Sequence, residues 1–380
     1  MDALFVGRSA AHQWASVASL SKIASAWSLN NAAATTLARF GSPLAANCSY
    51  GKLLSREGRN RARSTRKTDL LFSASGVRRG VRLFAAMASR DASAGAGAVG
   101  VAAGNEDALQ FAKIDNRRFL HVVYRVGDLE NTVKFYTECL GMKVLRERDV
   151  PQEKYKNVFL GFGPEETNFA VELTYNYGVD KYDIGEGFGH FGISVEDVHK
   201  VVDLVKQKGG KVTREPGPVK GGKSVIAFVE DPSGYKFELI QRPKTPEPLC
   251  QVMLRVGDLD RSIAFYENAL GMKLLRKRDN PDYKYTIAMM GYGPEESSTV
   301  LELTYNYGVA AYSKGNAYAQ IALGTDDVYK TAEAVRNHGG KITREPGPIP
   351  GINTKIFAFL DPDGWKTVFV DNEDFLKELA

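Results

Sequence analysis

The sequence predicts an α+β protein of four β-α-β-β-β modules, arranged as two tandem repeats that form two barrel-like domains. Two observations lead to this prediction. First, sequence blocks recur 130 residues apart: RVGDL at 125–129 returns at 255–259. Second, each repeat is itself double, because LHVVYRV at 120–126 aligns with GHFGISV at 189–195. Copies of one unit are expected to fold alike and to stack on one another.

The elements of a module follow from its residue pattern. A run rich in β-branched and aromatic residues at 120–126 predicts the first strand. An acidic residue, Asp128 in the first module and Glu196 in the second, then opens a helix with apolar residues at helical spacing. Gly141 is placed to end the first helix. Three further strands are expected at 142–148, 156–163 and 168–175.

Composition and prolines set the expected domain boundaries. Residues 1–105 are expected to be a transit peptide and linker, and the repeats to span 118–242 and 248–372. The PKTPEP segment at 243–248 separates them, since three prolines in six residues continue neither a helix nor a central strand. The joint between the repeats is therefore expected to be short and stiff.

Charge is distributed unevenly along the chain. Residues 1–100 hold 14 Lys or Arg and four acidic residues, so the remainder has a net charge of −5 although the whole chain carries +5. An acid-poor, Ser-rich and Arg-rich leader is typical of organelle transit peptides and favours the plastid stroma. A basic tail that binds an acidic partner is the alternative. The acidic remainder does not favour nucleic-acid binding, and no apolar run approaches the ~18 residues of a membrane span.

Polar residues at equivalent positions of the two repeats, most of which differ, indicate a candidate metal site. The aligned pairs are His121 and Gln251, Glu172 and Glu302, His190 and Gln320, and Glu238 and Val368. Imidazole and carboxylate groups together suit a divalent ion such as nickel, zinc, cobalt or iron. A single histidine at a strand end is more often an ordinary hydrogen-bonded residue. A carboxylate in an apolar strand, in contrast, needs a cation or a shifted pKa.

Several motifs, in the same order, resemble the glyoxalase I (lactoylglutathione lyase) family of the vicinal oxygen chelate superfamily. They are FYTECLGMKVLR, ELTYNYG, GHFGISVEDV and DPSGYKFEL, and the resemblance, to the fused two-domain plant form, covers about 118–372. It implies a lyase that isomerises the hemithioacetal of methylglyoxal and glutathione to S-lactoylglutathione. It also implies one divalent metal ion, with nickel favoured and zinc or cobalt as alternatives. Glutathione would be part of the substrate.

The family builds each metal site from two modules, and a fused chain allows two pairings. Pairing within a repeat would join His121, Glu172, His190 and Glu238. Pairing across the repeats would join Gln251, Glu302, His190 and Glu238. Either pairing leaves one defective set, because Val368 can neither bind a metal nor accept a proton. The cross-repeat pairing is favoured, since the short joint mimics the two closely spaced chain ends of a dimer.

The resemblance also implies roles for single residues. Glu238 would be the general base, with Glu172 or Glu302 opposite it, and His190 would line the substrate site. An arginine and an asparagine would hold the glutamyl carboxylate of glutathione. The candidates are Arg125 with Asn176, or Arg255 with Asn306. Lys220 or Lys223, in the loop at 218–223, would meet the glycyl carboxylate.

Other functions on the same fold remain as alternatives. An extradiol dioxygenase would use two histidines and one carboxylate on iron, so the extra carboxylate does not favour it. An acyl-CoA epimerase is a further enzyme of this fold. A non-catalytic ligand-binding module, of the bleomycin-resistance type, is the alternative from another class. The fused repeats are expected to make a monomer self-sufficient.

Overall fold

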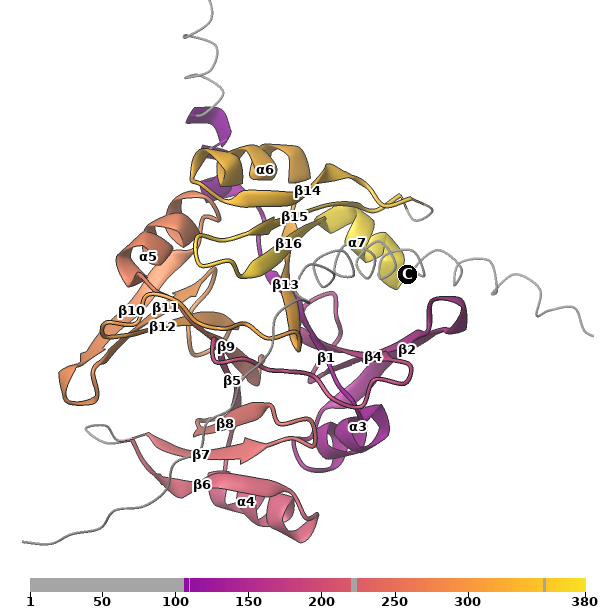
Figure 1. Ribbon diagram of the computed structural model, residues 1–380, viewed down its shortest axis with the longest axis vertical. Helices are drawn as coiled ribbons and strands as arrows, with labels where there is room; N and C mark the ends of the chain where they lie inside the picture. Colours follow the sequence, from indigo (N-terminus) through magenta and orange to yellow (C-terminus); the bar gives the residue numbers. More distant parts are fainter. Residues whose placement is uncertain (1–105, 109, 220–223, 351–352) are drawn as a thin grey trace, which may run out of the picture.

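The protein is described from a computed structural model over residues 106–108, 110–219, 224–350 and 353–380. The expected transit peptide, together with Lys220 and Lys223, lies outside these residues. In the described part the chain forms two eight-stranded sheets, with helices α3 to α6 at the periphery (Figure 1). None of the described helices is long and apolar enough to cross a membrane.

The first repeat contains two modules with the predicted order of elements. The first module comprises β1 (Phe119–Arg125), α3 (Leu129–Glu138), β2 (Lys143–Val150), β3 (Tyr155–Gly161) and β4 (Ala170–Asn176). The second comprises β5 (Phe188–Val195), α4 (Val198–Gln207), β6 (Lys211–Pro218), β7 (Val225–Glu230) and β8 (Lys236–Gln241). A short 3₁₀ turn at Pro151–Glu153 separates β2 from β3.

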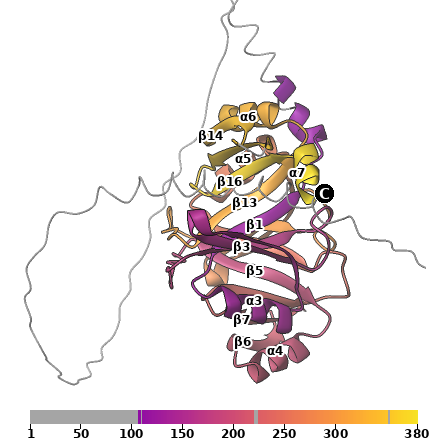
Figure 2. The same cartoon turned by 90° about the vertical axis from the view of Figure 1, so that its right-hand side faces the viewer.

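The second repeat has the same order and adds a C-terminal helix. Its first module comprises β9 (Leu249–Arg255), α5 (Leu259–Asn268), β10 (Lys273–Asn280), β11 (Tyr285–Gly291) and β12 (Val300–Asn306), with a 3₁₀ turn at Pro281–Tyr283. Its second module comprises β13 (Tyr318–Thr325), α6 (Val328–Asn337), β14 (Lys341–Pro348), β15 (Lys355–Leu360) and β16 (Lys366–Asp371). Helix α7 (Asn372–Leu379) follows β16 and lies beside it (Figure 2). The prediction of four β-α-β-β-β modules is confirmed.

An aspartate begins each of the helices α3 to α6. Asp128 accepts a hydrogen bond from the backbone N–H of Asn131, which satisfies one of the free donors of the first turn. In the second module the cap is Asp197, one residue after the expected Glu196, and it accepts from the N–H of Lys200. Gly141 follows the first helix with φ of +79°, a conformation that glycine adopts without strain.

Each sheet combines one module from each repeat. The strand orders are β14-β15-β16-β13-β1-β4-β3-β2 and β10-β11-β12-β9-β5-β8-β7-β6. Strand β1 pairs antiparallel with β13, and β5 pairs antiparallel with β9, so these central pairs join the repeats. The first module therefore shares a sheet with the fourth, and the second with the third. This is the cross-repeat pairing.

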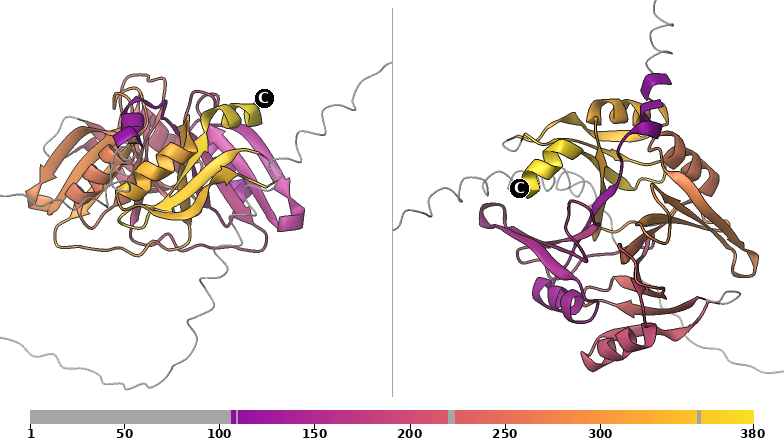
Figure 3. Two further views of the ribbon diagram at one scale, coloured as in Figure 1. Left: turned by 90° about the horizontal axis from the view of Figure 1, so that it is seen from above. Right: turned by 180° about the vertical axis from the view of Figure 1, so that it is seen from behind.

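Buried polar contacts hold the two sheets and the N-terminal segment together. The Tyr136 hydroxyl on α3 donates to the Asp231 carboxylate of the other sheet at 2.8 Å, and Tyr266 makes the matching contact with Asp361. Arg117 donates to the Thr331 hydroxyl of α6 and to the carbonyl oxygen of Ala269. The segment before β1 thus runs along α5 and α6 (Figure 3).

Candidate metal centre

Four side chains from four neighbouring strands form a first cluster, which we define as His190, Glu238, Gln251 and Glu302. They lie on β5, β8, β9 and β12, respectively. Gly192 pairs with both Gln251 and Glu238 across the sheet. A Cβ atom at Gly192 would lie 2.0 Å from Gln251 Cγ, so the glycine allows the glutamine to enter the cluster.

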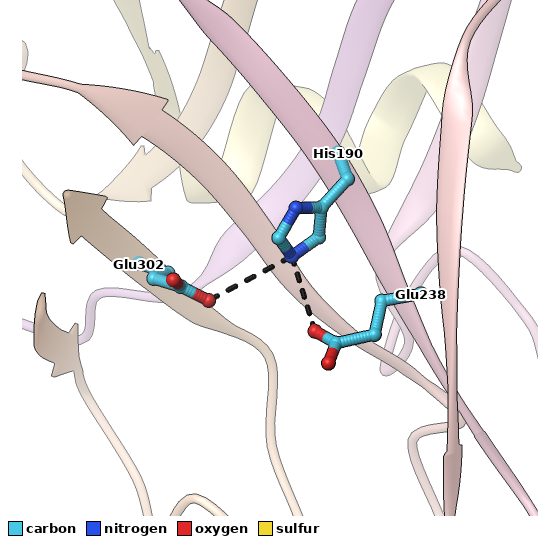
Figure 4. Close-up of side chains that lie close together, drawn as sticks. All are labelled: His190, Glu238 and Glu302. Atoms are coloured by element: carbon cyan, nitrogen blue, oxygen red, sulfur yellow. Dashed lines mark ion pairs between the residues drawn. The ribbon is translucent and has the colours of Figure 1, made fainter. Parts of the chain in front are cut away.

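The polar atoms of the first cluster converge on one point. His190 Nε2 lies 3.1 Å from Glu238 Oε2 and 3.7 Å from Glu302 Oε2 (Figure 4). The three side chains offer ligand atoms that all lie within 4.8 Å of one another. Among the described residues, no other group of three or more His, Cys, Asp or Glu side chains meets this criterion.

The amide of Gln251 occupies the middle of these groups. Its Nε2 donates to Glu238 Oε2 at 2.8 Å and to Glu302 Oε2 at 3.1 Å, and it lies 3.0 Å from His190 Nε2. A donor surrounded by three such groups marks a place that favours positive charge. A half-turn of the amide exchanges its nitrogen for its oxygen, so Gln251 can also offer a ligand atom. One imidazole, one amide and two carboxylates therefore fit a divalent cation.

Burial and mutual charge set the protonation of the first cluster. Burial raises the pKa of Glu302, while the positive charge of a protonated His190 opposes this rise. Burial alone would lower the pKa of His190, but its hydrogen bond to Glu238 and the charges of Glu238 and Glu302 outweigh burial and raise it. The buried carboxylate of Glu302 and the partly buried one of Glu238, beside one imidazole, are stabilised by a positive charge between them.

A second cluster, defined as His121, Glu172, Gln320 and Val368, occupies the matching place in the other sheet. His121 Nε2 lies 3.4 Å from Glu172 Oε2. Val368 is completely buried and offers no ligand atom. Burial lowers the pKa of His121 to about 3 and raises that of Glu172 to about 7. These shifts favour the neutral forms, as expected of polar groups buried without a compensating charge.

Helix α7 packs against the second cluster. The ring of Phe375, which is buried, lies 6.4 Å from that of His121. Phe375 also belongs to the same apolar group as Val368. At the end of the helix, the Thr354 hydroxyl donates to the Glu378 carboxylate. In the first repeat the corresponding chain continues into the joint at 243–248, and Phe228 from β7 approaches His190 instead, with ring centroids 5.3 Å apart.

The residues expected to hold substrate make intramolecular contacts in this structure. Arg255 donates to the carbonyl oxygens of Glu186 and Phe188, and Arg125 donates to that of Asn316. The side-chain amides of Asn176 and Asn306 donate to the hydroxyls of Tyr182 and Tyr312, respectively. The strands place the two arginines, because Arg255 lies on β9 with Gln251 of the first cluster, whereas Arg125 lies on β1 with His121 of the second.

A cavity of about 820 Å³ lies elsewhere, beside α3 and strands β2 to β4. Its lining includes Asp128, Glu147, Lys156 and Tyr175 but no member of either cluster. This cavity therefore does not coincide with either cluster. The candidate site is identified by the geometry of its side chains alone.

Two residues that contact the clusters were not predicted from the sequence. Thr304 donates to Glu302 Oε1 at 3.2 Å, and Asn157 donates to Glu172 Oε1 at 2.5 Å. A signal for Thr304 was present, because residues two apart on a strand share a face. Asn157 lies on a different strand from Glu172, and its partner became visible only when β3 and β4 were paired.

Comparison with known proteins gives close matches over the described repeats. A family model described as the Glyoxalase/Bleomycin resistance protein/Dioxygenase superfamily matches residues 118–239 and 249–369. The chain is 77% identical over 274 residues to a probable lactoylglutathione lyase, chloroplastic, of Arabidopsis thaliana, which covers 72% of this chain and 78% of that protein. It is 71% identical over 279 residues to a lactoylglutathione lyase of Oryza sativa subsp. japonica, covering 72% of this chain and 96% of that protein.

A solved structure is similar in both sequence and fold. The crystal structure of glyoxalase I from Zea mays is 73% identical and superposes with a TM-score of 0.70. The match covers 71% of this chain and 98% of the maize chain. Both tandem repeats are thus shared with that protein.

Proposed function

The chain belongs to the Glyoxalase/Bleomycin resistance protein/Dioxygenase superfamily, and from this premise we propose that it is a lactoylglutathione lyase. The reaction is the isomerisation of the hemithioacetal of methylglyoxal and glutathione to S-lactoylglutathione. The observation that supports this function best is the convergence of His190, Glu238, Gln251 and Glu302 from two repeats. Relatives with the same activity in their names match both repeats.

The reaction rearranges hydrogen within the substrate and needs no external oxidant. The proton on C1 of the hemithioacetal moves to C2. The C1 hydroxyl loses its proton and the C2 oxygen gains one, so C1 becomes the thioester carbonyl and C2 carries the hydroxyl group. A divalent cation, when bound, supplies positive charge beside the two substrate oxygens on which negative charge develops. Nickel is the favoured ion, with zinc or cobalt as alternatives.

Glu238 is the proposed general base. Its Oε2 faces the centre of the first cluster and lies 3.1 Å from His190 Nε2, so it is close to where the substrate carbon would be held. A base that takes the proton from C1 can return it to C2 because both carbons of a planar intermediate present the same face to it. Glu302, on β12, is the proposed metal ligand that remains in place. His190 and Gln251 are the other two proposed ligands.

Arg255 and Asn306 are the proposed contacts for the glutamyl carboxylate of glutathione at this site. The planar guanidinium group of arginine matches a carboxylate with two parallel hydrogen bonds. Arg125 and Asn176 are their counterparts beside the second cluster, where no base is available at Val368. Lys223 is the proposed contact for the glycyl carboxylate of glutathione.

The proposed activity is tested by a direct assay. Metal-free protein is loaded with Ni²⁺, Co²⁺ or Zn²⁺ and mixed with methylglyoxal and glutathione, and absorbance at 240 nm reports thioester formation. We expect a rise that depends on the metal. No rise with any of the three ions would refute the lyase activity and would favour the non-catalytic ligand-binding module.

We also propose that the protein acts as a monomer in the plastid stroma. One relative carries the word chloroplastic in its name, and residues 1–100 have the basic, acid-poor composition of a transit peptide. A fluorescent protein fused after residue 105 should enter plastids. Retention of the fusion in the cytosol would refute the targeting function.

A further inference from the structure

The two carboxylates of the first cluster are held in different ways. Glu302 divides its oxygens: Oε1 accepts from the Thr304 hydroxyl at 3.2 Å, while Oε2 faces Gln251 Nε2 at 3.1 Å and His190 Nε2 at 3.7 Å. Both Glu302 and Thr304 are buried. They lie two residues apart on β12, which places both side chains on the same face of the strand. Thr304 therefore fixes the outer oxygen of the carboxylate from behind.

Glu238 has no equivalent support from its own strand. The residue two positions further along β8 is Ile240, a buried aliphatic side chain that has no hydrogen-bond donor. Among the described residues, the contacts of Glu238 within the cluster all use Oε2, which meets Gln251 at 2.8 Å and His190 at 3.1 Å. These contacts hold Glu238 only through the atom that faces the centre of the cluster. A carboxylate anchored at one atom can rotate more freely than one anchored at both.

The second cluster supports its carboxylate through a different residue. There Glu172 Oε1 accepts from the side-chain amide of Asn157 on β3, at 2.5 Å. The position of Asn157 corresponds to Ile287 on β11, which cannot donate. The hydroxyl of Thr304 thus gives Glu302 the support that an amide on the next strand gives Glu172. Thr174, the counterpart of Thr304, provides a matched control site.

We propose that Thr304 is a positioning residue that holds Glu302 as the stationary metal ligand, and that the lack of such a donor on β8 leaves Glu238 free to move the proton. This inference rests on the proposed function. Residues that orient ligands through hydrogen bonds typically change metal affinity by about 10- to 100-fold when they are replaced. The hydroxyl of Thr304, rather than its size, is therefore expected to matter.

The test compares Thr304→Val, which removes the hydroxyl at nearly constant volume, with Thr304→Ser, which keeps it. The dissociation constant of Ni²⁺ is measured for the metal-free full-length chain by competition with a coloured chelator. We expect Thr304→Val to bind Ni²⁺ about 10- to 100-fold more weakly than the parent. Thr304→Ser should restore the affinity to within about threefold of the parent, which a purely volume-based role of Thr304 would not predict. Thermal unfolding establishes that each variant is folded.

Thr174→Val is the control in the other repeat, and it should leave the Ni²⁺ affinity unchanged. Equal affinities of Thr304→Val and the parent would overturn the proposal, as would equal losses in Thr304→Val and Thr174→Val. Absence of Ni²⁺ binding by the parent would overturn both this proposal and the proposed metal centre. Ni²⁺ binding without turnover in the 240 nm assay would refute only the lyase activity, because the affinities of the variants still decide the role of Thr304.

Discussion

The first and second clusters occupy matching places in the two sheets, but only the first brings two carboxylates to one imidazole. In the first cluster, Glu238 and Glu302 both face His190. In the second, Glu172 is the one carboxylate that faces His121, and Val368 stands where a second carboxylate would be. The loss of one carboxylate thus leaves a single carboxylate and imidazole where the first cluster has converging ligands. The comparison shows how a duplicated chain can keep a fold while only one copy of the site keeps its chemistry.

The surroundings of the second cluster are also more apolar on the side of helix α7. Helix α7 places Phe375 near the His121 ring and joins Val368 to an apolar group that also contains Leu120 and Ile356. Burial favours the neutral forms of both His121 and Glu172. Val368, Leu120 and Ile356 are themselves buried, and the burial of such aliphatic side chains stabilises the fold.

The largest expected effect comes from removing the proposed base. Glu238→Gln keeps the shape of the side chain but can no longer accept a proton, so kcat should fall by about 10³-fold or more. Val368→Ala, at the matching position of the second cluster, should leave kcat within about twofold while lowering thermal stability, because it removes buried methyl groups. Initial rates at 240 nm with saturating metal measure both. A slow Val368→Ala variant that is fully folded would contradict the assignment of turnover to the first cluster.

Ligand removal tests the pairing across repeats. Gln251→Ala should weaken Ni²⁺ binding by about 100-fold, the upper end of what replacement of a supporting residue causes, because Gln251 is a proposed ligand itself. His121→Ala should leave metal content and rate unchanged. Metal analysis after dialysis, together with the assay, separates the two variants. Loss in His121→Ala alone would mean that the site is built within one repeat.

The smallest expected effect concerns stability and the second cluster. Burial raises the pKa of Glu172 to about 7, whereas an unfolded glutamate has a pKa of about 4.3. The folded state therefore binds more protons between these values, and this contribution to stability is present at low pH and is lost as pH rises through about 7. Glu172→Gln carries no charge and avoids the loss.

The free energy of unfolding of Glu172→Gln, relative to the parent, should therefore increase by about 2 kcal/mol from pH 5 to pH 8. Urea unfolding at each pH provides the measurement. A difference that stays constant with pH would show that Glu172 ionises as readily in the folded protein as in the unfolded chain, and would contradict the raised pKa. That result would make the two clusters more alike than the structure indicates.

The sequence predicted the elements well because their causes are local. Asp128 and Gly141 bound a helix through contacts within a few residues, and strands rich in β-branched residues carry their own alternation. The candidate ligands were also visible, since aligned repeats expose substitutions such as Glu238 to Val368. The support from Asn157 and the packing of Phe375 were not predictable in this way. The first depends on how β3 pairs with β4, and the second on a helix that lies far from His121 in the chain.

By itself, the sequence determined four repeated modules and which polar residues could act as ligands, because a duplicated pattern records both. It left two pairings of those residues open. The tertiary structure decided between them by joining β5 to β9 and β1 to β13, so that each sheet crosses the repeats. Backbone hydrogen bonds between distant strands make this choice. They bring Gln251 and Glu302 to His190 and Glu238, where one buried and one partly buried carboxylate are stabilised by positive charge.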